Sequence, residues 1–166
     1  LAETKEHAKA LIAFAAVRRR DTLKPADLVK VGKAQFGLGQ EDSAIASYEA
    51  AVAADSTNCD PFFDMGFLYM KRQQYDNAAR MFERKIVCDK GSLSAYVNAA
   101  ASYMQIKNYS RARELLGRSI ELKPDFGTAI NNLAVLYLQQ GQINDAVAAL
   151  EYGVKVSPGE EVLYLN

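Results

Sequence analysis

The chain has 166 residues, of which 49% are hydrophobic and 24% charged, with only 4 prolines. This length fits a single domain, and the composition is typical of a folded helical protein. Its 20 basic and 20 acidic residues cancel, which argues against nucleic acid as a partner because phosphate binding needs an excess of cations.

The first predicted element is a helix over residues 2–19. Ala10, Phe14 and Val17 lie at spacings of four and three, which places them on one helix face. Arg18 to Arg20 then form the one basic run. Cations there favour the negative end of the helix dipole, and contact with an acidic partner is the alternative.

The rest of the chain follows a fixed period of 34 residues, with registers that begin at Pro25, Cys59, Leu93 and Gly127. A period of this length indicates stacked helical hairpins. The first helix fits the same register. Because both ends fall inside a repeat and the chain begins with Leu1, we expect a fragment of a longer array. The sequence therefore predicts one array, composed of 1–24 (second helix of a preceding partial repeat), 25–58, 59–92, 93–126, 127–160 and 161–166 (start of a further repeat).

Within each repeat, apolar residues define the two helices of a hairpin. Positions four, seven, eight and eleven line the first helix, and positions twenty, twenty-four and twenty-seven line the second. Small residues at positions eight and twenty let the two backbones approach. The twentieth position holds Ala44, Ala78, Ala112 and Ala146. Turns are expected at Gly39-Gln40, Gln73-Gln74, Lys107-Asn108 and Gly141-Gln142. Tyr69, Tyr103 and Tyr137 share the eleventh position, where we expect them in the core.

These columns resemble the tetratricopeptide repeat family, with a large apolar residue, Gly or Ala, Tyr, Ala, an aromatic or Leu, and a closing Pro at Pro124 and Pro158. The resemblance implies an all-α, right-handed superhelical solenoid of antiparallel helix hairpins. It also implies a concave groove lined by the first helices, which hold partners at positions two, five, six, nine, twelve and thirteen. The partner-binding residues implied in this way are Lys30, Lys33, Phe36, Phe63, Phe67, Met70, Asn98, Met104, Asn132 and Val135.

An exposed apolar strip is expected at these groove positions, because hairpin packing does not need them. Its members are Phe63, Phe67, Met70, Met104, Val135 and Leu138. Chaperone-tail binders of the family use a two-carboxylate clamp of Lys and Asn residues. Repeats one to three place Val29 and Lys33, Asp64, and Ser94 and Asn98 at those positions. The other window of three repeats does not match the clamp either. Recognition of an acidic chaperone tail is therefore disfavoured.

No catalytic constellation appears in the sequence. His7 is the only histidine and is expected as an exposed helix residue rather than a catalytic base. Cys59 and Cys88 provide too few ligands for zinc. Their positions allow a disulfide, but two buried reduced thiols are the preferred interpretation. We expect no cofactor, no metal and no membrane insertion, since the longest uncharged stretch carries several Asn and Gln residues.

The predicted function is a protein-interaction scaffold that binds a peptide or helix of a partner, within a multiprotein assembly. It is not predicted to be an enzyme. The alternative is a docking or regulatory arm of an enzyme whose catalytic domain lies elsewhere, and self-association is a third possibility. The sequence does not specify a compartment, and a cytoplasmic location is the default.

Overall fold

The computed structural model describes residues 2–18 and 23–158, with the side chains of residues 4–12 and 23–158. The described residues form nine helices and divide into two compact units, residues 1–72 and 73–166. The predicted basic run beyond Arg18 and the segment 161–166 lie outside the described residues. The all-helical fold expected from the periodicity is confirmed.

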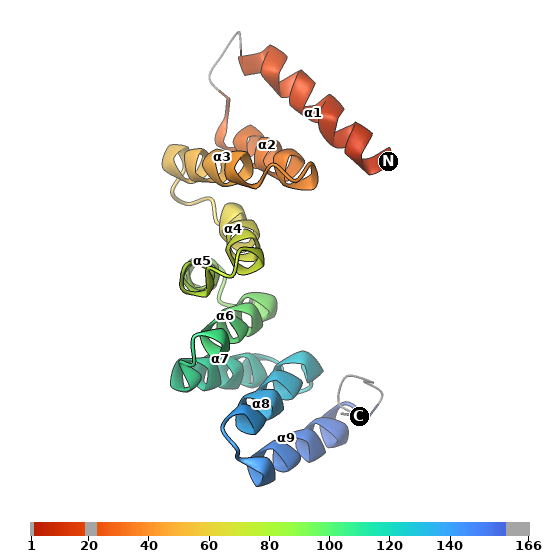
Figure 1. Ribbon diagram of the computed structural model, residues 1–166, viewed down its shortest axis with the longest axis vertical. Coiled ribbons are helices and arrows are strands. Elements are labelled where there is room, and N and C mark those ends of the chain that lie inside the picture. The colour runs from red at the N-terminus through yellow and green to blue at the C-terminus, as the bar shows by residue number, and fades with distance from the viewer. Residues whose placement is uncertain (1, 19–22, 159–166) are drawn as a thin grey trace. The chain divides into compact units, whose positions relative to one another are not determined.

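The first unit holds four helices: α1 (Ala2–Arg18), α2 (Pro25–Gly37), α3 (Glu41–Ala54) and α4 (Asp60–Lys71). Helices α2 and α3 form a tight antiparallel hairpin (Figure 1), while α1 packs against α2 and α4 packs against α3. Proline occupies the first turn of α2 and of α4, where its missing N–H group costs no hydrogen bond.

The second unit holds five helices: α5 (Tyr75–Cys88), α6 (Leu93–Gln105), α7 (Tyr109–Leu122), α8 (Gly127–Gln139) and α9 (Ile143–Val156). Each helix packs on the next, with hairpins formed by α6 with α7 and by α8 with α9. Helices α7 and α9 end shortly before Pro124 and Pro158, as the sequence predicted.

The predicted turns are confirmed at the junctions within the hairpins. Gly39 and Gly141 adopt a positive φ of 74°, the left-handed conformation that commonly ends a helix. Gln73 and Lys107 adopt the same conformation with φ of 59° and 60°, although a Cβ atom disfavours it. The backbone of the turn therefore follows the repeat even where its glycine is replaced.

Small residues pack the hairpins as predicted. Ala44, Ala78, Ala112 and Ala146 are at most 1% exposed. A Cβ atom added to Gly32 in α2 would lie 2.5 Å from Cε1 of Tyr48 in α3, so the Tyr48 ring occupies the space that glycine leaves. The tyrosines at the eleventh position are half-buried rather than fully in the core. Gln35 replaces tyrosine there in α2, and its Oε1 accepts a hydrogen bond of 2.7 Å from Ser47 Oγ.

Two expectations for individual side chains were wrong. His7 is not an exposed helix residue, because its ring packs on Gly37 so closely that a Cβ atom there would meet the imidazole, and its Nδ1 is buried. Cys59 and Cys88 are not buried reduced thiols. Both are disulfide-bonded, Cys88 is exposed and Cys59 is half-buried.

Candidate functional site

The predicted binding residues fall into two groups, one in each unit. Lys30, Lys33 and Phe36 lie on α2, and Phe63, Phe67 and Met70 lie on α4, so six of the ten belong to the first unit. Asn98 and Met104 lie on α6, and Asn132 and Val135 lie on α8, in the second unit. Helices α2 and α4 contact each other, as do α6 and α8.

In the first unit, aromatic side chains from α2 and α4 meet at the surface. The rings of Phe36 and Phe67 form an edge-to-face pair with centroids 6.3 Å apart, a favourable aromatic geometry. Phe67 nevertheless remains 48% exposed, while Phe36, Phe63 and Met70 are half-buried. We call the four side chains Phe36, Phe63, Phe67 and Met70 the aromatic surface. It offers apolar area to water, most of all at Phe67.

The lysines beside the aromatic surface are both exposed. Lys30 Nζ lies 3.3 Å from Asp27 Oδ1 on the same helix. Lys33 has no ion pair among the described residues, and its charge acts on Asp64 of α4. Lys33 is therefore the better placed of the two to bind an acidic group of a partner.

Asp64 is a polar feature of the first unit that the sequence did not single out as a site. Burial raises the pKa of its carboxyl group, although the nearby Lys33 cation opposes this shift. Its Oδ2 and the Oη of Tyr48 are buried, and the two groups lie close enough to shift each other's pKa. Burial, together with the Asp64 charge, raises the pKa of the Tyr48 hydroxyl. The pattern of apolar positions could not have revealed this pair, because Asp64 lies on a face that the hairpin does not need.

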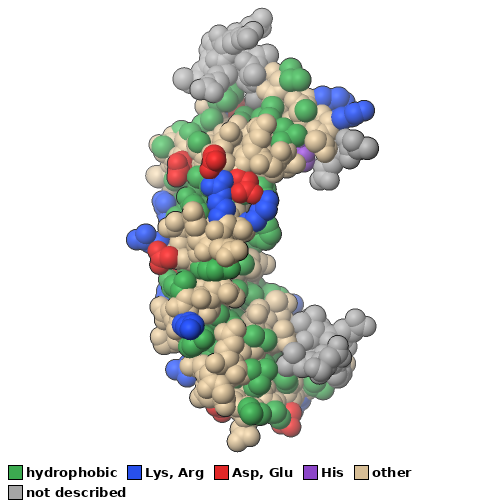
Figure 2. Space-filling view, viewed as in Figure 1, with side chains coloured by type: hydrophobic (Ala, Val, Ile, Leu, Met, Phe, Trp, Pro, Cys, Tyr) green, Lys and Arg blue, Asp and Glu red, His purple; other side chains and the backbone are tan. Residues whose placement is uncertain are grey.

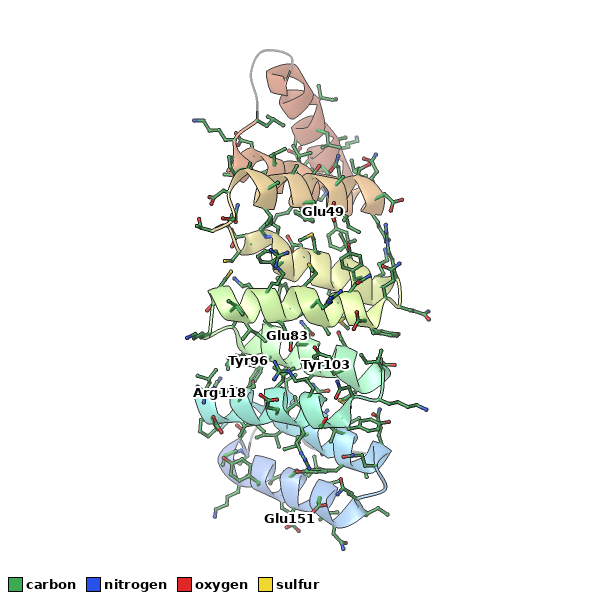
Figure 3. All side chains as sticks on the ribbon, turned by 90° about the vertical axis from the view of Figure 1, so that its left-hand side faces the viewer. Glu49, Glu83, Tyr96, Tyr103, Arg118 and Glu151 are labelled. Carbon is green, nitrogen blue, oxygen red and sulfur yellow. The ribbon has the colours of Figure 1, made fainter. Side chains whose placement is uncertain are left out.

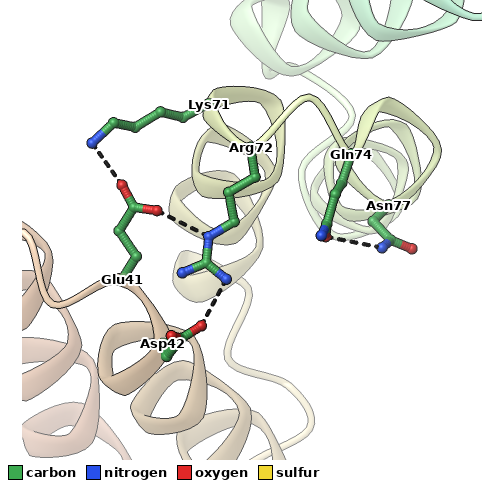
Figure 4. Close-up of polar contacts among 6 residues, drawn as sticks. All are labelled: Glu41, Asp42, Lys71, Arg72, Gln74 and Asn77. Carbon is green, nitrogen blue, oxygen red and sulfur yellow. Dashed lines mark hydrogen bonds and ion pairs between the residues drawn. The ribbon is translucent and has the colours of Figure 1, made fainter.

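Four charged side chains fix the end of α4 against the start of α3 (Figure 4). Glu41 binds Lys71 Nζ at 2.6 Å through Oε1 and Arg72 Nε at 2.9 Å through Oε2, and Arg72 Nη1 also lies 2.8 Å from Asp42 Oδ1. Hydrogen bonds from Lys71 and Arg72 hold the pKa of Glu41 below its usual value. Acidic and basic side chains are mixed on the surface of this unit (Figure 2). Lys71 therefore has an internal partner.

In the second unit, the predicted residues are largely engaged within the chain. Met104 is only 6% exposed, so the expectation that it belongs to an exposed strip was wrong. Asn132 Nδ2 donates a hydrogen bond of 3.0 Å to the carbonyl of Thr128 on its own helix. Asn98 and Val135 are half-buried, and Leu138 beside them is 45% exposed. Asn131, at the fifth position of its repeat, has a buried Oδ1 acceptor without a partner.

The described residues contain no group of three or more His, Cys, Asp or Glu side chains that could hold a metal ion. In the part of the chain that the structure describes, no helix has the length and apolar character needed to cross a membrane.

Successive antiparallel hairpins with small residues at their contacts define the chain as a helical repeat protein. Residues 28–58 and residues 103–165 each match a tetratricopeptide repeat model. The chain belongs to the tetratricopeptide repeat family. Neither matching model describes an enzyme. No curated protein sequence matches the chain.

Solved structures share this fold at low sequence identity. The crystal structure of MamA is 22% identical, with a TM-score of 0.83 over 92% of this chain and 89% of MamA. The C-terminal part of a repeat-containing protein from Cytophaga hutchinsonii is 24% identical, with a TM-score of 0.74 over 81% of this chain and 54% of that one. The first repeat domain of Spaghetti (RPAP3), solved with an HSP90 peptide, is 21% identical, with a TM-score of 0.65 over 73% and 96%.

Proposed function

We propose that the chain is a protein-interaction scaffold that binds a peptide or helix of a partner protein on the first helices of its repeats. The repeats proposed are those of the 34-residue register, 25–58, 59–92, 93–126 and 127–160, with residues 1–24 as part of a preceding one. Membership of the tetratricopeptide repeat family supports binding of a protein or peptide. The observation that carries the specific proposal is the aromatic surface.

Phe67 makes this surface a binding site rather than part of the core. Its ring contacts Phe36, yet 48% of the side chain faces water. Aromatic and methionine side chains are enriched at protein interfaces, where they bury large apolar areas. Lys33 lies on the same helix as Phe36 and adds a cation beside the apolar area.

The partner proposed is not an acidic chaperone tail. The related fold of RPAP3 was solved with an HSP90 peptide, but this chain has Val29 and Asp64 at positions where that class of site needs amide and basic groups. Asp64 would repel an acidic terminus. A partner segment with large apolar side chains fits the aromatic surface better.

The test compares three variants of equal charge change. Phe67→Asp and Met70→Asp place a carboxylate in the aromatic surface. Val147→Asp places one at a side chain in α9 that is also 48% exposed. Affinity capture from the cells that make the protein should recover the same partner with the parent chain and with Val147→Asp.

The first two variants should lose that partner while the circular dichroism spectrum stays helical. Retention of the partner by both Phe67→Asp and Met70→Asp would show that the aromatic surface is not the binding site.

A further inference from the structure

A second surface lies in the unit of residues 73–166, between α5 and α7. A groove of about 670 Å³ opens there, with Ile86 of α5 and Tyr96 of α6 among its walls. Two of its lining residues, Tyr96 on α6 and Arg118 on α7, are labelled in Figure 3, where they lie close together. Its volume is in the range of ligand-binding clefts. This groove uses the second helices of the repeats, whereas the aromatic surface uses the first.

Gly117 lines the groove in the middle of α7, where packing does not require a glycine. Its backbone is helical, and a Cβ atom added to it would meet nothing within 4 Å. Glycine destabilises a helix interior relative to alanine. The same repeat position holds Glu49, Glu83 and Glu151. Glycine allows a ligand to approach a backbone closely, and the open space at Gly117 leaves room for such an approach.

The residues that line the groove are also more basic than the residues at the same positions of the other repeats. Arg113 stands where they have Ile45, Ala79 and Val147. Together with the loss of a glutamate at Gly117, this makes the third repeat more basic on this face.

The arginines that line the groove differ in their ion pairs. Arg118 Nη1 lies 2.6 Å from Glu121, and Arg111 is held by Glu83 at 2.8 Å and Glu114 at 2.7 Å. Arg113 is exposed and makes no ion pair with any described residue. Arg118 is 60% exposed, and such surface pairs exchange partners at little cost. Arg113 and Arg118 are therefore both available to an external carboxylate.

We propose that this groove is a second docking site, which takes an extended acidic segment of a partner protein. The segment's backbone lies against Gly117, and its carboxylates pair with Arg113 and Arg118. Arginine suits this role because its planar guanidinium group binds a carboxylate through two hydrogen bonds. The proposal is independent of the one for the aromatic surface, since no residue is shared.

The first experiment uses the isotope-labelled full chain and two peptide libraries. One is an octapeptide library with glutamate at two fixed positions and random residues elsewhere, and the other has glutamine at those positions. Titration followed by nuclear magnetic resonance should shift the amide signals of Gly117, Tyr96 and Ile86 with the glutamate library only. Unchanged signals at Gly117, or equal shifts with both libraries, overturn the proposal.

The second experiment blocks the groove without damaging the helix. Gly117→Glu restores the residue of the other repeats and should raise the melting temperature, because open space surrounds the new side chain. It should weaken binding of the glutamate library at least tenfold in fluorescence anisotropy, as should Arg113→Ala. Phe67→Asp should leave this binding unchanged. Wild-type affinity in Gly117→Glu, despite a folded chain, contradicts the proposal.

A second copy of the chain is the competing occupant. Light scattering over a concentration series would then show a dimer that Gly117→Glu converts to a monomer, with no binding of the glutamate library. That result would also overturn the proposal of an acidic partner segment.

Discussion

The predicted binding residues behave differently in the two units, although they come from the same columns of the repeat. In residues 1–72 they form the aromatic surface, and Phe67 is 48% exposed. In residues 73–166, Met104 is buried and the Asn132 amide bonds to its own helix. A shared register therefore gives two side chains the same place on a helix but not the same availability to a partner.

The difference follows from what each side chain can reach. The phenylalanine side chain has no hydrogen-bonding group. Phe36 and Phe67 contact each other edge to face, and part of the Phe67 ring stays exposed to water. Asparagine can bond to a carbonyl one turn earlier on its own helix, as Asn132 does with Thr128. The proposed binding energy therefore resides mainly in the first unit, and the following predictions test that division.

The largest difference should appear between two methionines at the same repeat position. Met104→Ala should destabilise the chain by about 3 kcal/mol, because it removes a buried side chain and leaves a cavity. Met70→Ala should cost only about 1 kcal/mol, since Met70 is half-buried. Urea unfolding measures both values.

Partner capture should show the opposite order, with binding lost in Met70→Ala and retained in Met104→Ala under conditions where both are folded. Equal losses of stability in Met70→Ala and Met104→Ala would contradict the distinction between a half-buried methionine in the first unit and a buried one in the second.

The edge-to-face contact between Phe36 and Phe67 should make a measurable contribution to the free energy of unfolding. A double-mutant cycle with Phe36→Leu and Phe67→Leu should give a coupling energy of about 1 kcal/mol, the usual range for an edge-to-face pair. Chemical denaturation of the four proteins provides the cycle. The control pair is Phe36→Leu with Val147→Ala, which lie in different units and should be additive. A coupling near zero would mean that the rings pack independently.

The Asp64 carboxyl should make stability depend on pH. Because burial raises its pKa in the folded chain, the folded state holds the proton more tightly, and stability falls as pH rises from the unfolded pKa through the folded one. Asp64→Asn removes this charge and should stabilise the chain by about 1 kcal/mol at neutral pH. The gain should disappear as the pH falls below the ordinary aspartate range. Thermal unfolding across pH checks this, with Asp125→Asn as the control, because Asp125 is exposed and its charge does not act on Asp64.

Much of the fold was predictable because the same local pattern of residues recurs in each repeat. The turn residues Gly39 and Gly141 and the alanine column need only chain-local spacing to be recognised. The burial of Met104 and the contact of His7 with Gly37 were not predictable in this way. Periodicity assigns a residue to a helix face, but burial depends on neighbours that are distant in the sequence. The Glu41–Arg72 pair is another such case.

The smallest effect should come from Asn132, which the sequence had placed among the binding residues. Its Nδ2 is engaged with the Thr128 carbonyl one turn away, and alanine is the better helix former. Asn132→Ala should therefore change stability by at most about 0.5 kcal/mol and leave partner capture intact. Asn98→Ala, at the same repeat position in α6, is the matched variant. If Asn132→Ala abolished partner capture without changing stability, the second unit would also supply binding contacts. The proposed division between the two units would then be wrong.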